Sequence, residues 1–318
     1  WEGDSFRHEA CCYLDAGELH ERLVPFVVEG LEREEPVAVV GGQTVLDVLA
    51  EALGEDTRRL AVLQSAQAWW QDGGQRGHGC VREWDVALRS LQRTGRPFRV
   101  VGEPVWLGAG AGRRWSSYEA VGNRSWADLP CYCLCLHDRS RLDAVVLDEV
   151  ARTHPFTWDR RQAAPVPCDA YQDPREFVLD TQPRWRERPA RAVTDEVRDP
   201  RAARRALQSA VPPAWADRTD DVVLAAHELV INALREVGVA ELTTWVEPDE
   251  GEADGGRAVL VVEVADRGPG LADPLRGYRL PGSDPEGGRG LWVAWGLADD
   301  VSVGEAPGTR VRLFFRRP

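Results

Sequence analysis

Strand-like and helix-like segments alternate along residues 20–150, and this alternation restricts the fold of the chain more than any other feature. Short apolar runs that read as strands occupy residues 36–40, 60–63, 98–102 and 131–136. Helical periodicity is found at residues 44–53, where the Thr44 hydroxyl is expected to cap the helix, and at about 81–91, 116–123 and 141–152. Strands that alternate with helices of this length form parallel sheets covered on both faces. We therefore predict an N-terminal parallel α/β domain.

The length of the chain predicts a second domain. A single core usually stops growing at about 250–300 residues, and this chain has 318. Six prolines occur between residues 153 and 190 without clear periodicity, which is typical of a linker. We therefore expect one domain at 1–155, a Pro-rich linker at 156–192 and a second domain at 193–318.

The second domain is expected to be an α+β layer. A basic amphipathic helix is predicted at 200–211, and a second helix is predicted to begin with a cap at Thr219 and to carry Glu228 and Asn232. Strands are predicted at 241–247, 259–265, 300–303 and 310–315.

Composition limits the classes of partner. The net charge of −13 argues against direct binding of nucleic acid, which requires a basic surface. Neither a signal peptide nor an apolar run of the ~20 residues that span a bilayer is visible, so we expect a cytoplasmic protein that does not bind membranes. All 39 basic residues are Arg, which excludes a phosphate loop of the G-x-x-x-x-G-K-[ST] kind. The scarcity of Ile and Asn indicates a GC-rich, actinobacterial genome.

A ligand pocket is predicted where the apolar run 259–265 ends. Asp266, Gly268 and Gly270 follow directly, and glycines there let a ligand approach the backbone closely. On the preceding helix, Glu228 and Asn232 are four residues apart and project from the same face. Asn is a poor helix former, and its side-chain oxygen is a ligand that Mg²⁺ accepts.

These residues resemble the motifs of the GHKL ATPase superfamily. Glu228–Asn232 is similar to the N box, Asp266-x-Gly268-x-Gly270 to the G1 box, residues 287–291 to the G2 box, and Gly308-Thr309 to the closing element beside the adenine. The resemblance covers residues 195–315 and implies an ATP·Mg²⁺ site in an α+β (Bergerat) sandwich. Asp266 would accept a hydrogen bond from the adenine amino group, with Thr309 sharing a water, and Asn232 would hold Mg²⁺. Gly288 and Gly290 would open a helix at Leu291 whose first N–H groups bind phosphate, and residues 271–286 would form the lid.

Within this superfamily the domain is most similar to the anti-sigma-factor serine kinases of the RsbW and SpoIIAB kind. That resemblance implies that Glu228 is the general base for a Ser or Thr hydroxyl. It also implies a sigma factor and a STAS-type anti-anti-sigma protein as partners, and a homodimer is one oligomeric state to consider. Glu236 departs from the pattern, because the family often has His four residues after Asn232, and an acid near phosphates would slow phosphotransfer. A histidine kinase would need a phosphoacceptor on a long helical hairpin, whereas His154 precedes a proline.

The N-terminal half resembles the MEDS (DcmR-like) sensory domain, an α/β fold related to RecA-type ATPases. The resemblance is carried by residues 6–10, 23–31, 102–106, 118–120 and 153–155. A MEDS domain fused to an anti-sigma kinase domain is a recurrent actinobacterial (RsbA-like) arrangement.

The cysteines allow two interpretations. Cys131, Cys133 and Cys135 alternate on one predicted strand, and Cys11, Cys12, His8 and His137 are candidates for the same neighbourhood. Small apolar side chains lining a buried strand would account for this pattern. A thiolate-bound metal or a redox sensor is the sharper alternative.

Taken together, the sequence predicts a stress-response regulator of transcription. An N-terminal sensor would control a GHKL domain that binds ATP·Mg²⁺, holds a sigma factor and phosphorylates the antagonist. A nucleotide-gated binding module without catalysis and a degenerate sensor histidine kinase are the alternatives.

Overall fold

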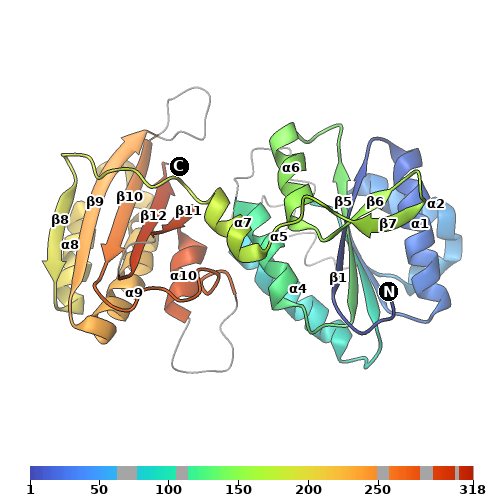
Figure 1. Ribbon diagram of the computed structural model, residues 1–318, viewed down its shortest axis with the longest axis horizontal. Helices are drawn as coiled ribbons and strands as arrows, with labels where there is room; N and C mark the ends of the chain where they lie inside the picture. Colours follow the sequence, from blue (N-terminus) through green and yellow to red (C-terminus); the bar gives the residue numbers. More distant parts are fainter. Residues whose placement is uncertain (63–76, 105–113, 249–257, 280–288, 305–307, 318) are drawn as a thin grey trace. The chain divides into compact units, whose positions relative to one another are not determined.

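The chain consists of two compact units, residues Trp1–Phe177 and Val178–Pro318 (Figure 1). The computed structural model describes residues 1–62, 77–104, 114–248, 258–279, 289–304 and 308–317. Each unit contains its own sheet.

The N-terminal unit is built on a seven-stranded sheet with the order β3-β2-β4-β5-β1-β6-β7. Its strands are β1 (Arg7–Tyr13), β2 (Val37–Val40), β3 (Ala61–Val62), β4 (Phe98–Gly102), β5 (Cys131–Asp138), β6 (Phe156–Asp159) and β7 (Ala164–Pro167). All neighbouring strands are parallel except β7, which pairs antiparallel with β6. Its helices are α1 (Ala16–Glu32), α2 (Gln43–Leu53), α4 (Gly77–Gln92), α5 (Arg114–Ser125) and α6 (Ala144–Thr153), with a 3₁₀ turn η1 (Gly54–Arg59) after α2.

Helices cover both faces of this sheet (Figure 1). Each face has its own core of buried side chains. On one face, α1 and α2 pack against side chains such as Val37, Val39 and Leu134. On the other face, Leu88 of α4 packs against Ala38 and Val100. Alternate residues of β2 thus enter opposite cores, which confirms the predicted parallel α/β fold.

Strand β1 occupies a central position although its sequence does not alternate simply between polar and apolar residues. The carboxylate of Glu9 is fully buried there and accepts two hydrogen bonds from Arg22 of α1, at 2.7 and 2.6 Å, and one from the Tyr132 hydroxyl. A buried carboxylate needs such partners. The ion pair with Arg22 therefore explains how Glu9 can lie in a central strand. The sequence did not predict this strand.

Two predicted helix caps are wrong. Helix α2 follows Gly42 and has no side-chain cap, so Thr44 lies inside the helix; the Gly42 N–H donates to the carboxylate of Glu103 at 2.7 Å. In the C-terminal unit, Thr219 is already the first residue of α9 (Thr219–Val237), because the 3₁₀ turn η3 (Pro213–Arg218) leads directly into this helix.

Much of the segment predicted as a linker is folded. Strands β6 and β7 extend the N-terminal sheet beside β1, and helix α7 (Pro174–Thr181) follows. Further along, Trp185 and Arg188 contact the sheet of the C-terminal unit: Trp185 donates to the Val303 carbonyl at 3.2 Å, and Arg188 pairs with Glu263 at 2.6 Å. The prolines of this segment therefore lie in ordered connections.

The C-terminal unit is a five-stranded antiparallel sheet with the order β11-β12-β10-β9-β8. Its strands are β8 (Val193–Val197), β9 (Ala240–Pro248), β10 (Ala258–Ala265), β11 (Asp300–Val303) and β12 (Arg310–Arg316). Its helices are α8 (Pro200–Ala210), α9 and α10 (Arg289–Leu297). The predicted strands are all present, β8 is additional, and the α+β expectation is confirmed.

No helix among the described residues combines the length and the apolar character that crossing a membrane would require.

Candidate functional site

Helices α9 and α10 approach closely at Gly290, in the first turn of α10. A Cβ atom at position 290 would lie 2.6 Å from Oε2 of Glu228 and 3.5 Å from Nδ2 of Asn232. A side chain at position 290 would require the Glu228 carboxylate to move. The start of α10 therefore lies directly beside the two polar side chains of α9 that the sequence singled out.

Helix α10 begins at Arg289, two residues before the predicted opening at Leu291, and Leu291 itself is buried. The first N–H groups of a helix have no partner within it, and with the helix dipole they favour phosphate. Of the predicted phosphate-binding glycines, Gly290 lies at this position, whereas Gly288 falls outside the described residues.

The Asp266 turn closes the other end of the candidate site. One carboxylate oxygen of Asp266, Oδ1, accepts from the N–H groups of Gly268 at 2.8 Å and Thr309 at 3.2 Å. The Asp266 N–H donates in turn to the Thr309 carbonyl at 2.8 Å. The structure thus brings Asp266 and Thr309 together, and Oδ2 of Asp266 has no protein partner in the described parts of the chain.

Two glycines of this turn adopt backbone conformations that other residues avoid. Gly270 has φ +86° and Gly308 has φ +91°. At Gly308 a Cβ would lie 2.0 Å from the carbonyl oxygen of Asp266, so a side chain there would force the two loops apart. Gly308 therefore holds Thr309 against the Asp266 turn.

Glu236 lies at the Asp266 end of the site. A Cβ at Gly268 would lie 3.2 Å from Cγ of Glu236, whereas Glu228 and Asn232 lie beside Gly290. Successive turns of α9 thus run from the start of α10 to the Asp266 turn. The acid that replaces the expected histidine is next to the turn predicted to bind the base.

Two family models match the chain. Residues 7–155 match MEDS, the MEthanogen/methylotroph, DcmR Sensory domain, and residues 193–315 match the histidine kinase-like ATPase domain. The chain therefore combines a MEDS sensory domain with a histidine kinase-like ATPase domain of the GHKL class, as the motifs indicated. This class implies an ATP-binding, kinase-like regulatory module. A search of curated proteins found no significant match.

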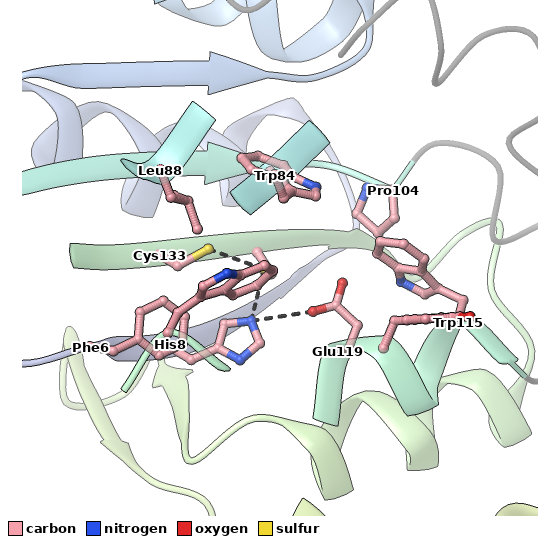
Figure 2. A pocket seen from close by; sticks show the side chains of 12 residues that line it. Phe6, His8, Trp84, Leu88, Pro104, Trp115, Glu119 and Cys133 are labelled. Atoms are coloured by element: carbon pink, nitrogen blue, oxygen red, sulfur yellow. Dashed lines mark hydrogen bonds and ion pairs between the residues drawn. The ribbon is translucent and has the colours of Figure 1, made fainter. Parts of the chain in front are cut away.

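A second candidate site lies in the MEDS domain, where a pocket opens among aromatic side chains (Figure 2). Phe6, Trp84 and Trp115 line it, together with His8, Glu119 and Cys133. Nε2 of His8 lies 3.4 Å from Oε2 of Glu119 and 3.2 Å from Sγ of Cys135. Polar groups that converge in an apolar pocket are typical of a ligand-binding site.

The titratable groups of this second site affect one another. Burial alone would lower the pKa of His8, but the hydrogen bond to Glu119 and the nearby negative charges of Cys133 and Glu119 raise this pKa above its ordinary value. The hydrogen bond from Cys135 and the charge of His8 lower the pKa of Cys133 although burial opposes them. The same hydrogen bond, with burial, raises the pKa of Cys135.

Two further buried histidines, one of them outside this site, are held neutral. Burial, followed by the charge of His8, lowers the pKa of His137 to about 3. Burial, with the charges of His8 and His137, lowers that of His154 well below its ordinary value. The ring centroids of His8 and His154 are 4.0 Å apart.

The structure brings together only part of the predicted sensor set. His8, Cys133 and Cys135 meet, with Cys133 and Cys135 Sγ atoms 3.7 Å apart. Cys131 packs in the core beneath α4, and Cys11 enters the core on the opposite face of the sheet. Cys12 is half-buried, and burial raises its pKa to about 11.

Two residues of the second site were not among the predicted sensor residues. Glu119 comes from α5, and His154 follows α6 directly. Both lie in segments that carried the MEDS resemblance, 118–120 and 153–155, and that was the signal by which they could have been found.

Proposed function

We propose that this protein is an anti-sigma regulator. Its histidine kinase-like ATPase domain binds ATP·Mg²⁺, holds a sigma factor and phosphorylates a Ser or Thr of a STAS-type anti-anti-sigma protein, under the control of the MEDS domain. The proposal of kinase activity rests on the position of Glu228 Oε2 and Asn232 beside the first turn of α10.

The residues present suit ATP·Mg²⁺. The amide oxygen of Asn232 offers a hard ligand for Mg²⁺, and the first N–H groups of α10 suit the phosphates. At the other end, Oδ2 of Asp266, which has no hydrogen-bond partner among the described residues, could accept a hydrogen bond from an amino group. Bound ATP·Mg²⁺ supplies the phosphoryl group that is transferred.

Glu228 is suited to act as the general base. Its carboxylate takes the proton of the Ser or Thr hydroxyl as the oxygen of that residue bonds to the γ-phosphorus, and ADP leaves with the electrons of the broken P–O bond. Glu236 lies one or two turns further along α9, beside Gly268. We therefore expect the charge of Glu236 to have little effect on phosphotransfer.

The structure gives no support to the histidine kinase alternative. His154, the last histidine before the ATPase domain, is fully buried, and its Nδ1 bonds to the Val150 carbonyl at 2.8 Å. A phosphoacceptor must be accessible to the ATP of a kinase domain.

Incubation with γ-labelled ATP and the cognate antagonist tests the proposal. We expect acid-stable label on the antagonist, lost in Glu228→Gln with ATP binding retained, and kept in the matched variant Glu236→Gln. Sigma-factor binding without any label would instead identify a nucleotide-gated module. Acid-labile label on this chain would identify a histidine kinase.

A further inference from the structure

Four potential metal ligands converge at the base of the aromatic pocket in the MEDS domain. They are His8 of β1, Glu119 of α5, Cys135 of β5 and His154 at the end of α6. Their ligand atoms all lie within 4.8 Å of one another. They come from four separate elements, so the tertiary fold and not a local turn brings them together.

The spacing of these atoms suits a small tetrahedral ion. Zn²⁺ binds nitrogen and oxygen at about 2.0–2.2 Å and sulfur at about 2.3 Å, so neighbouring ligand atoms in a tetrahedron are about 3.3–3.8 Å apart. Nε2 of His8 lies 3.4 Å from Glu119 Oε2 and 3.2 Å from Cys135 Sγ. Two edges of the tetrahedron are thus already near their final length.

Hydrogen bonds orient His8 as a ligand. Asn123 donates from Nδ2 to the Thr153 carbonyl at 2.7 Å, which fixes the orientation of its amide group. Its Oδ1 therefore accepts from Nδ1–H of His8 at 3.0 Å, so Nε2 of His8 faces Cys135 and Glu119, where a metal ion would take the place of the Nε2 proton. A metal-bound histidine usually donates its other N–H to such an oxygen.

His154 has the same arrangement. Its Nδ1 donates to the Val150 carbonyl at 2.8 Å, and its Nε2 is buried without a hydrogen-bond partner in the described residues. A buried polar atom without a partner is costly, and each one calls for an explanation. A metal ion among these four groups would give the His154 Nε2 lone pair the partner it lacks.

We propose that His8, Glu119, Cys135 and His154 form a binding site for a borderline divalent transition-metal ion, with Zn²⁺ as the best match. Two imidazoles, one thiolate and one carboxylate are the donors that Zn²⁺ accepts, whereas Mg²⁺ and Ca²⁺ prefer oxygen alone. His8, Glu119 and Cys135 also line the pocket, which provides an entry path for the ion. Cys133 is a neighbour of the site and not a ligand.

The test is metal reconstitution of the full-length protein after stripping with a chelator. We expect one Zn²⁺ per chain, and with Co²⁺ in its place a thiolate-to-cobalt absorption band together with the intense visible bands of tetrahedral Co²⁺. Cys135→Ser should abolish the thiolate band. The matched variant Cys168→Ser, which removes a thiol whose Sγ bonds to the Ala151 carbonyl, should retain it.

A second variant tests the orientation of His8. Asn123→Ala removes the oxygen that accepts from Nδ1–H, and loss of such a partner typically weakens metal binding about 10–100-fold. The thiolate band should persist at saturating Co²⁺, because Cys135 is unchanged.

X-ray absorption of the Zn²⁺-loaded wild type needs no variant, so a misfolded mutant cannot obscure the answer. One sulfur and three nitrogen or oxygen neighbours would support the site. A chain that retains no metal, a shell without sulfur, or a Co²⁺ spectrum unchanged by Cys135→Ser would overturn it, and His8 would then simply pair with Glu119.

Discussion

At the residue scale, two glycines allow close contacts in the ATPase site because they have no Cβ atom. Gly290 admits the first turn of α10 beside Glu228, and Gly308 lies against the Asp266 carbonyl. The sequence identified both glycines from their order relative to Asp266. It could not show that Gly290 lies beside Glu228 and Asn232, because that contact depends on tertiary packing.

Substitution of Gly308 should destabilise the C-terminal unit more than substitution of another glycine with positive φ. Gly238 has φ +76° and open space around its Cβ position, so Gly238→Ala should cost about 1–2 kcal/mol from backbone conformation alone. Gly308→Ala adds a clash with the Asp266 backbone and should cost more. Hydrogen exchange of the β10 and β12 amides measures both, and equal protection in the two variants would contradict the described turn.

Burial of thiols in the MEDS domain makes a prediction about reactivity. Burial raises the pKa of Cys12 from 9.0 to about 11, so at pH 8 its thiolate is about a hundredfold scarcer than in the unfolded chain. Alkylation of Cys12 in the native protein, followed by peptide mass spectrometry, should still accelerate as the pH rises above 10. A rate that levels off near pH 9, as expected for the urea-unfolded control, would be inconsistent with this burial.

At the element scale, the segment before β8 belongs to the C-terminal sheet. Glu263 of β10 is fully buried and pairs with Arg188 of that segment and with Arg312 of β12, at 2.6 and 2.7 Å. Arg312 also lies over the Trp185 ring, at 4.1 Å from its centroid. This ion-pair cluster explains how a charged residue fits in a central strand.

Removing the central carboxylate should therefore be costly. Glu263→Ala leaves the buried Arg312 without its partner, and breaking a buried pair in this way typically costs about 3–5 kcal/mol. The matched variant Glu196→Ala breaks the exposed pair with Arg198 and should change stability by less than about 1 kcal/mol. Faster hydrogen exchange in β10 and β12 for Glu263→Ala alone is the expected result, and similar exchange in both variants would argue against the cluster.

The same elements show what a sequence can and cannot predict. Apolar runs and alternating apolar residues predicted β2, β3, β4, β5 and the strands of the C-terminal unit other than β8. They missed β1 and the β6–β7 hairpin, where Glu9 needs a distant Arg22 and where prolines suggested a linker. Whether such a segment forms a strand depends on contacts with residues far away in the sequence, which local patterns do not show. The convergence of Glu119 and His154 on His8 depends on such contacts too.

At the scale of the whole molecule, each of the two units has its own sheet and its own core. We expect calorimetry to resolve two unfolding transitions. ATP·Mg²⁺ at about 100 times its Kd should stabilise the C-terminal unit by about 2.7 kcal/mol. It should therefore raise the transition temperature of the C-terminal unit more than that of the N-terminal unit. A single unfolding transition that ATP·Mg²⁺ shifts as a whole would contradict the presence of two independently unfolding units.

The order of four short motifs predicted the class of the C-terminal domain, and each motif alone was weak. Their agreement in space is what the structure adds, since Asn232 and Glu228 lie beside Gly290 while Thr309 lies against Asp266.

Calorimetric titration of the full-length protein with ATP, with and without Mg²⁺, tests the central claim most directly. We expect Asn232→Ala to abolish the Mg²⁺-dependent binding of ATP. Asn123 is the only other asparagine of the chain, and Asn123→Ala should bind ATP as the wild type does. Unchanged Mg²⁺-dependent affinity in Asn232→Ala would contradict the assignment of the whole pocket.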